Sequence, residues 1–486
     1  MTETVDDAPP IEHPHENSVR VVWALAWPAV ALNSLQVVNT LLDRAFIGHL
    51  PTESLTAHGG SMNIMFLMFS LAMALATGST ALVARSFGAG EKREFRKASR
   101  QSISLAIAFG LLTALITCAF SDDAAQAILP SGNPADQTAI RLMGQFLFAY
   151  GVGLPAIYII QSLAGCLRGI GDTKSPMVIS GVQILLHICL NYLLIFPPHQ
   201  FLGVTVPGAG LGLVGAAVAL SISAWMSAIV YLLFSAKTPL GALYKVALPD
   251  PFWAWRILRI AIPAGVMAIL RVLSLTAFTL ILAVVPGGAV AIGAMTVGFA
   301  IESIMFMPAF GLSTAAGALV GQSLGMKRPD RAERLAWTAG HHAALVTVAL
   351  VVPIFLGAGW IAHMLLGGKE EVVAQATSLL RYLCVTEIFF AYAMVMLGAM
   401  QGAGDTTRPM WITVFSLWGL RVPLALFLAI AGGQTLFTFF GQRVALPFGS
   451  GMGPQGAWIA LSITQAVQGI LAIIAFRHGA WKHKKV

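Results

Sequence analysis

The chain alternates between long apolar segments and short polar connections. Twelve apolar segments can be delimited, and most of them exceed the roughly 20 residues that a helix needs to cross a bilayer. They cover residues 21–47, 58–86, 99–120, 139–167, 176–196, 211–236, 256–285, 289–324, 337–366, 377–401, 409–431 and 456–476. This pattern predicts an all-α polytopic membrane protein with twelve transmembrane helices.

The first segment carries a stripe of polar residues along one helical face. Its members recur at spacings of three or four residues and are Asn33, Gln36, Thr40 and Asp43. Lipid cannot satisfy polar groups, so the stripe should face the inside of a bundle or a wet cavity. The alternative is that Asp43 pairs with Arg44 near the membrane surface. Adjacent helical residues point about 100° apart, which makes that pairing awkward, so we predict a functional role for Asp43.

Composition and charge support the membrane assignment. The chain is 57% hydrophobic and only 10% charged, whereas a soluble protein carries roughly a quarter charged residues. Of its 29 lysines and arginines, 22 fall on alternate connections counted from the N-terminus. Cytoplasmic loops are enriched in these residues, so we expect a multi-pass protein of the cell membrane, inner membrane in a double-membraned cell, with both termini cytoplasmic. The same rule explains the basic cluster at 85–100, and we expect no nucleic-acid partner.

The two halves of the chain resemble each other at three places. The matched pairs, each 233 to 237 positions apart, are 169–177 with 402–410, 82–88 with 319–325, and 27–29 with 262–264. Near-constant offsets predict two parallel, pseudo-symmetric six-helix bundles, an architecture of transporters. The expected organisation is a disordered cytoplasmic tail (1–20), an N-terminal bundle (21–236), a cytoplasmic linker (237–255), a C-terminal bundle (256–476) and a basic cytoplasmic tail (477–486).

The paired loops each contain a Gly-Asp-Thr sequence. Glycines 171 and 404 suit the end of one helix, and the Asp or Thr that follows (Asp172 or Thr173, Asp405 or Thr406) suits the cap of the next. We therefore interpret these loops as hinges and caps, with a direct role in gating as the alternative. Pro28 lies inside the first span, where it favours a bend.

Several motifs resemble multidrug and toxic compound extrusion (MATE) transporters, especially the DinF-like branch. The first span is similar through Pro28 and DRAFIGHL at 43–50. The other motifs are IES at 301–303, FMPAFG at 306–311, LVGQ at 319–322, RGIGDT at 168–173, QGAGDT at 401–406 and LWGLRVP at 417–423. The resemblance covers residues 21–476 and implies the fold and an export function, but no particular substrate.

The chain also departs from the family pattern. The fifth span of the family often has Asn followed four residues later by Asp, and this chain has His187 and Asn191 there. These two residues form a stripe with Gln183 that reaches a depth similar to that of Asp43. We expect the two stripes to share one wet cavity within the N-terminal bundle. The predicted ion-coupling residues are Asp43, Asn39, Gln36, His187 and Asn191.

The second half carries four ionisable residues within its spans. Glu302, Arg271 and Arg421 lie near mid-depth, and Glu387 lies nearer the outer end. Arg271 also lies near the place of a seventh-span carboxylate that is typical of the NorM-like branch and missing here. Because a buried unpaired charge is expensive, the four residues either line a substrate cleft or form charge pairs, with Glu302 and Arg271 as the expected pair.

These features predict a secondary antiporter that exports amphiphilic, cationic compounds in exchange for H⁺ by alternating access. Na⁺ at Asp43 is the alternative coupling ion, and no other metal site is predicted. A carboxyl group in an apolar environment binds a proton more readily than one in water. Inward proton movement supplies about 2.3 kcal/mol per 100 mV and about 1.4 kcal/mol per pH unit. We expect a monomer whose partners are small-molecule substrates, protons or sodium ions, and the lipid bilayer.

Two other classes of protein fit the sequence less well. A lipid-linked saccharide flippase shares two-bundle folds, but it should present several cations to bind pyrophosphate, and here the membrane charges are few and mixed. An intramembrane enzyme should show a Ser/His, paired Asp or HExxH constellation within its spans, and none is evident. The sequence also lacks the G-x-x-x-x-G-K-[ST] loop of ATP-driven transporters, so we expect no cofactor.

Overall fold

Twelve helices in the described part of the chain are long and apolar enough to cross a membrane. The computed structural model describes residues 17–129, 132–201, 204–241, 248–367, 369–433, 435–439, 442–445 and 448–484. The predicted all-α polytopic fold is therefore confirmed. Most of the tail predicted at 1–20 and the central part of the linker at 237–255 lie outside the described residues.

The first half contains six of the spanning helices and one short helix. They are α1 (Ser18–Gly48), α2 (Thr52–Gly88), α3 (Lys92–Ala119), α4 (Ser121–Ile128, the short one), α5 (Pro134–Gly169), α6 (Lys174–Ile195) and α7 (Gly212–Ser235). Several begin before the apolar segment that predicted them. Polar first turns extend α3 from residue 99 back to Lys92, because a helix can continue into water beyond the hydrocarbon. At the start of α1, the Asn17 side chain accepts hydrogen bonds from the amides of Val19 and Arg20.

The second half repeats this arrangement. Its helices are α8 (Pro251–Val284), α9 (Gly288–Gly325), α10 (Pro329–Leu366), α11 (Glu370–Gly402), α12 (Thr407–Val414), η1 (Phe415–Arg421), α13 (Val422–Ala429), α14 (Pro454–Arg477) and η2 (Ala480–His483). The eleventh span is made of α12, η1 and α13, and η1 is a π-helix. Pro423 follows η1 by two residues. Its ring clashes with the carbonyl group four residues earlier, which favours a local widening of the helix.

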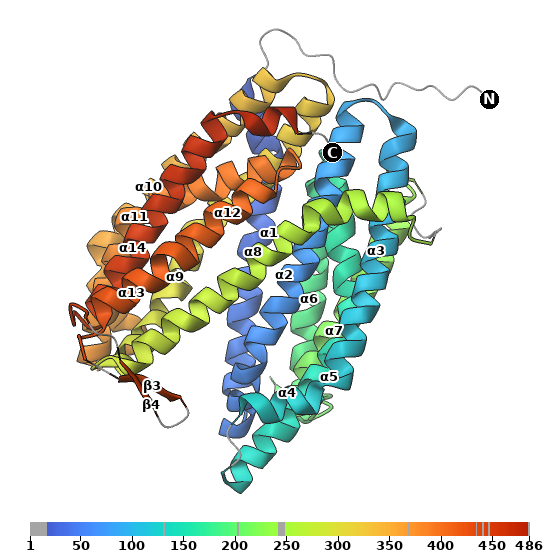
Figure 1. Ribbon diagram of the computed structural model, residues 1–486. Coiled ribbons are helices and arrows are strands. Elements are labelled where there is room, and N and C mark those ends of the chain that lie inside the picture. The colour runs from blue at the N-terminus through green and yellow to red at the C-terminus, as the bar shows by residue number, and fades with distance from the viewer. Residues whose placement is uncertain are drawn as a thin grey trace.

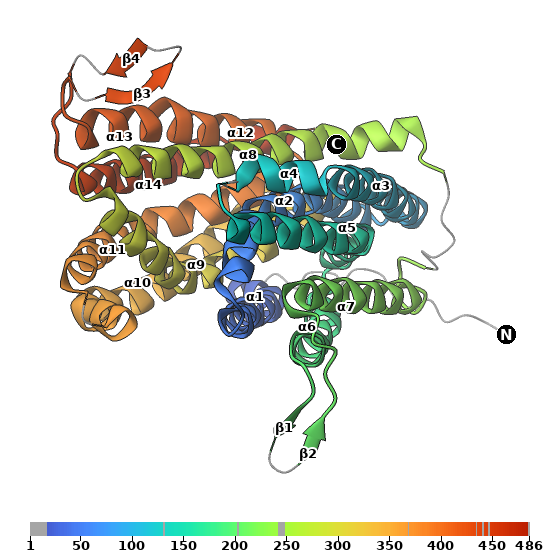
Figure 2. The ribbon, with the colours of Figure 1, turned by 90° about the horizontal axis from the view of Figure 1, so that it is seen from below.

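Two short antiparallel hairpins lie outside the spans. Strands β1 (His199–Phe201) and β2 (Val204–Val206) connect α6 to α7. Strands β3 (Thr435–Phe439) and β4 (Gln442–Ala445) connect α13 to α14. Figure 2 shows both hairpins extending from the helices. Helix–helix packing therefore forms the core of each half.

The two halves lie side by side and meet closely at one end of the molecule. We call this the terminal end, because α1 begins and α14 ends there (Figure 1). Helices α2 and α9 also end there, with Gly325 against Arg85. Helix α1 packs against α9, and α2 packs against both α8 and α9. Toward the opposite end the helices of the two halves diverge (Figure 1).

The two Gly-Asp-Thr loops have similar backbones but different side-chain contacts. Gly171 and Gly404 both adopt positive φ, 90° and 83°, which glycine adopts without strain at a helix end. Asp172 accepts a hydrogen bond from the Ser175 amide at 2.9 Å and so caps α6.

Among the described hydrogen bonds, Asp405 accepts none from a backbone amide of α12, and the side chain of Thr406 forms no cap either. The buried carboxylate of Asp405 contacts Arg408 and lies 3.8 Å from the Lys484 Nζ. The two loops therefore share the glycine turn, but the contacts of Asp172 differ from those of Asp405. The predicted cap by Asp or Thr is formed by Asp172 in the first loop, and no such cap is described in the second loop.

Candidate functional site

Asp43 lies at the centre of a polar network between α1 and α6. Asn191 donates a hydrogen bond to Asp43 Oδ1 at 2.6 Å, and Asn39 donates to Oδ2 at 3.4 Å. His187 Nδ1 lies 3.1 Å from Asn39 Oδ1. An amide oxygen can only accept, so His187 carries its proton on Nδ1 and donates to Asn39. The two predicted polar stripes thus meet in the structure, through Asp43, Asn39, His187 and Asn191.

The network is closed from solvent except at the carboxylate. The side chain of Asp43 is 24% exposed, whereas Asn39, His187 and Asn191 are buried. His187 Nδ1 is 3.9 Å from Asp43 Oδ1, too far for a hydrogen bond. The carboxylate of Asp43 is therefore the accessible group of this network, while Asn39, His187 and Asn191 are enclosed by packing.

Asn191 leaves one polar atom unused. Its Oδ1 is buried and has no hydrogen-bond partner. Buried polar atoms without partners are rare and mark places where an ion or water binds. Oxygen ligands suit a hard cation such as Na⁺, so the donor set of Asp43 and Asn191 fits a proton on Asp43 or a small cation between them. Among the described residues, no group of three or more His, Cys, Asp or Glu side chains is arranged to hold a metal ion.

Two other residues of the first span lie apart from this network. Gln36, predicted as an ion-coupling residue, is exposed. Arg44 is also exposed, and no ion pair joins it to Asp43 among the described ion pairs. The structure therefore does not favour the alternative that Asp43 pairs with its neighbour.

A second polar network lies within the C-terminal half. Gln465 on α14 donates a hydrogen bond to Glu302 Oε1 at 2.8 Å and accepts one from the Thr386 hydroxyl at 2.9 Å. Sequence reasoning missed Gln465 and Thr386. Gln465 and Gln468 are polar residues three positions apart in an apolar span, which was an available signal.

Glu387 is the least satisfied charged group of this half. Its side chain is buried, with 1% exposure, and neither carboxylate oxygen has a hydrogen-bond partner. It lies close enough to Glu302 for the two to interact electrostatically. Arg421 interacts with Glu302 in the same way, and its buried Nε also lacks a partner. Two carboxyl groups and the Arg421 guanidinium thus lie within electrostatic reach of one another.

The expected pairing of Glu302 with Arg271 is not seen. Arg271 on α8 lies close enough to Arg421 for the two like charges to repel, and no ion pair joins Arg271 to Glu302 among the described residues. The cation that faces Glu302 is Arg421, on the widened turn of η1. Sequence spacing gives the depth of a residue but not the rotation of its helix, and the π-helix changes that rotation.

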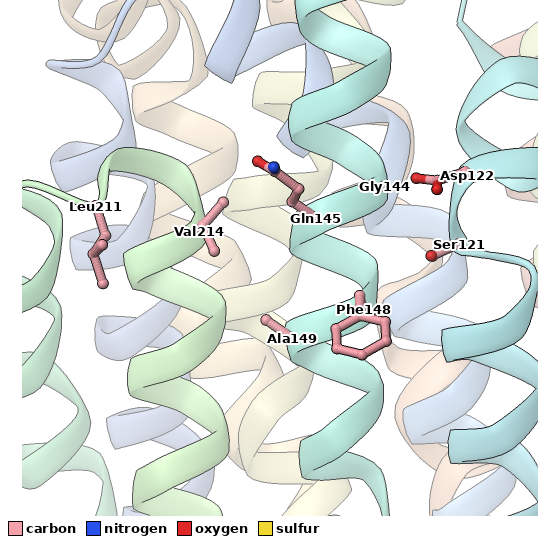
Figure 3. Close-up of a pocket in the computed structure, with 8 residues that line it drawn as sticks. All are labelled: Ser121, Asp122, Gly144, Gln145, Phe148, Ala149, Leu211 and Val214. Carbon is pink, nitrogen blue, oxygen red and sulfur yellow. The ribbon is translucent and has the colours of Figure 1, made fainter.

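A surface groove lies apart from both networks. It has a volume of about 560 Å³ and lies where α4, α5 and α7 meet. Figure 3 shows Leu211 and Val214 on one side of α5 and Ser121 and Asp122 on the other. None of the predicted ion-coupling residues lines this groove.

Comparison with known proteins gives a consistent result. The MatE family model matches residues 28–193 and 263–427. A probable multidrug resistance protein NorM from Thermotoga maritima is 27% identical over 467 residues, which cover 95% of this chain and 93% of the relative. The multidrug resistance protein MdtK of Yersinia pestis is 26% identical, with 96% of each chain covered.

Solved structures share the fold at lower identity. A MOP superfamily transporter from Pyrococcus furiosus matches with a TM-score of 0.83 and 20% identity, covering 96% of this chain and 97% of that chain. A structure described as the outward-facing conformation of a multidrug resistance MATE family transporter matches with a TM-score of 0.82 and 21% identity, covering 95% of each chain. The NorM and MdtK relatives are named for multidrug resistance rather than saccharide flipping, so the flippase alternative is not favoured.

Proposed function

The chain belongs to the MatE family of membrane transporters, and from this premise we propose that it is a secondary antiporter. It exports amphiphilic cations in exchange for H⁺ by alternating access, with Na⁺ as the alternative coupling ion. The observation that carries this proposal is the Asp43 network, in which one partly exposed carboxylate is held by buried Asn39 and Asn191. A carboxylate with one accessible edge can load and release an ion, which is the task of a coupling site.

The coupling step follows from the hydrogen bonds of Asp43. The ionised carboxylate accepts from two amides at once. A bound proton adds a donor and reduces the acceptor strength of that oxygen, so the hydrogen bond which the oxygen accepts is weakened. The new donor can then be satisfied by Asn191 Oδ1, which has no partner. Protonation thus rearranges the contact between α1 and α6.

Helix α1 can respond to this change at Pro28. Proline has no amide hydrogen, so the carbonyl of Ala24 loses its usual partner four residues later and the helix is weakest there. We propose that protonation of Asp43 bends α1 at Pro28 and expels the substrate outward. The carboxyl groups of Glu302 and Glu387 lie in the other half, within electrostatic reach of each other, and Glu302 also interacts with Arg421.

The proposed orientation places the terminal end in the cytoplasm. Cysteines introduced singly at Thr52 and Ala89, at opposite ends of α2, should react with a membrane-impermeant maleimide from opposite sides, and Ala89 should be protected in intact cells. Both residues are exposed, unlike the neighbouring buried Ser54. The native cysteines, free in this structure, are replaced first. Labelling from the same side would contradict both the orientation and the membrane-spanning course of α2.

Transport in proteoliposomes tests the function itself. The purified protein should move a lipophilic cation such as ethidium against its gradient when a pH gradient is imposed without sodium. If Na⁺ is the coupling ion, the sodium gradient alone should drive the same movement. No accumulation under either gradient, with several cationic compounds tried, would overturn the antiporter proposal.

A further inference from the structure

The second repeated motif of the chain has no part in the coupling network. LVARSFG at 82–88 and LVGQSLG at 319–325 form the last turns of α2 and α9. These turns touch across the two halves at the terminal end. Both members of the repeat therefore lie on one interface, and they face each other.

Two glycines let the backbones of these helices touch. A Cβ atom added to Gly88 would lie 2.1 Å from the backbone oxygen of Gln322. A Cβ atom added to Gly325 would lie 2.1 Å from the backbone oxygen of Arg85. Gly88 and Gly325 are equivalent in the repeat, as are Arg85 and Gln322, each pair being 237 positions apart. The contact therefore has an approximate two-fold relation.

The same two equivalent positions hold each half to the other by hydrogen bonds. Arg85 Nη1 donates to the carbonyl of Ala403 at 3.3 Å, and Gln322 Nε2 donates to the carbonyl of Gly169 at 2.9 Å. Gly169 is the last residue of α5, and Ala403 follows the last residue of α11. Carbonyls at helix ends have no partner within their own helix. Each half thus satisfies a helix end of the other half.

We propose that Arg85, Gly88, Gln322 and Gly325 form a reciprocal clasp that holds the terminal end closed. The role of this clasp rests on the proposed function, because alternating access requires the terminal end to open in one state and to close in the other. Its members are positioning residues. The contacts of the clasp can be broken without separating a buried ion pair or interlocked side chains. These contacts are two hydrogen bonds and a backbone-to-backbone surface, with no buried ion pair and no interlocked side chains among the residues named.

The two kinds of contact predict effects of different size. Loss of one side-chain hydrogen bond should lower the ratio of closed to open molecules about fivefold. Loss of both should lower it roughly 25-fold if the effects add. A methyl group on Gly88 meets backbone, which no side-chain rotation can relieve. Gly88→Ala should therefore disfavour the closed state more than the loss of one or of both side-chain hydrogen bonds.

Distances between spin labels measure this equilibrium directly. One pair of labels at Glu91 and Asp330 reports on the terminal end, and a second pair at Thr52 and Glu370 reports on the opposite end; all four residues are exposed. In Gly88→Ala the first distance should lengthen and the second should shorten. The matched control is Gly59→Ala on the same helix, where an added Cβ meets nothing within 4 Å.

Side-chain variants separate the clasp from a general loss of stability. Arg85→Ala and Gln322→Ala should each shift the distances in the same direction as Gly88→Ala, and the double variant should shift them further. Arg85→Gln places at position 85 the amide donor that the equivalent position, Gln322, carries in the other half. Unlike Arg85→Ala, it should therefore show the native distances. Thermal unfolding should change little across this series, because Arg85 and Gln322 act between the halves.

The distances need neither substrate nor gradient, so this test is independent of the transport assay. Wild-type protein that fails to export under any gradient would overturn the proposed function and leave the distances readable. Native distances in Gly88→Ala and in the Arg85→Ala/Gln322→Ala variant, with wild-type export intact, would overturn the clasp. If Gly88→Ala does not fold, the Arg85 and Gln322 series decides the question alone.

Discussion

Asp43→Asn should abolish export driven by a proton gradient while leaving a folded protein in the membrane. Asparagine keeps the shape of the side chain and much of its hydrogen-bonding capacity, but it cannot gain or lose the coupling proton. Each pH unit corresponds to a factor of ten in an equilibrium ratio. A gradient of two pH units should therefore sustain about a hundredfold substrate gradient in the wild type, through exchange of one proton per substrate of equal charge. In the variant this gradient should collapse.

The folded state of the variant should be close to native. The carboxamide introduced by Asp43→Asn can still accept from Asn191, and its own N–H can donate to the unpartnered Asn191 Oδ1 after a small rotation. Substrate binding should persist and is measured by fluorescence anisotropy in detergent. Equilibrium exchange of labelled substrate, which needs no net ion movement, should be less affected than uphill export.

Asp122→Asn is the matched control for this variant. Asp122 is a carboxylate that lines the groove of Figure 3, outside the Asp43 network. The same chemical change there should leave export near the wild-type level. Export at the native rate by Asp43→Asn would end the proposal that α1 holds the coupling site. The search would then move to Glu302 and Glu387.

The sequence predicted the spans well because hydrocarbon thickness and backbone hydrogen bonding leave few choices. A run of about 20 apolar residues in lipid can hardly be anything but a helix. Helix ends were less predictable. Polar turns that continue beyond the membrane, such as the start of α3 at Lys92, carry no hydropathy signal.

The contact between Asp43 and Asn191 could be anticipated because each helix carries one polar stripe at a similar depth. Two stripes that lipid cannot satisfy tend to meet, and that rule needs no knowledge of the rest of the fold. In the C-terminal half, the rule that such polar groups tend to meet allowed several pairings. Arg271, Arg421, Glu302 and Glu387 offered more than one pairing, and depth alone could not choose among them.

In the C-terminal half, local backbone geometry determined which charged residues interact. The π-helix at Phe415–Arg421 changes the rotation of the eleventh span, and its wider turn has no period that hydropathy can detect. Gln465 and Thr386 contributed hydrogen bonds from neutral side chains, which charge counting ignores. The resemblance to a family could not supply this either, because its motifs identify helices and loops rather than pairs.

Arg421→Met should destabilise the protein strongly, because it leaves the carboxyl groups of Glu302 and Glu387 in a buried region without their cation. Removing one partner of a buried pair costs several kcal/mol. Arg421 interacts with Glu302 electrostatically without being within ion-pair distance, so we expect about 2 kcal/mol, below the range for a direct pair. The measurement is the thermal unfolding midpoint of the purified protein in detergent at neutral pH.

A second substitution should reverse this loss. Glu302→Gln removes the carboxylate that faces Arg421, and its amide can still accept from Gln465. The double variant Arg421→Met/Glu302→Gln should therefore unfold at a higher temperature than Arg421→Met alone, since a neutral pair needs no compensating charge. Arg271→Met is the matched control. Arg271 repels Arg421 and forms no ion pair with Glu302 among the described ion pairs, so its loss should not lower the midpoint and Glu302→Gln should not rescue it. Rescue of Arg271→Met, with none for Arg421→Met, would restore the pairing of Glu302 with Arg271 and contradict the assignment of Arg421.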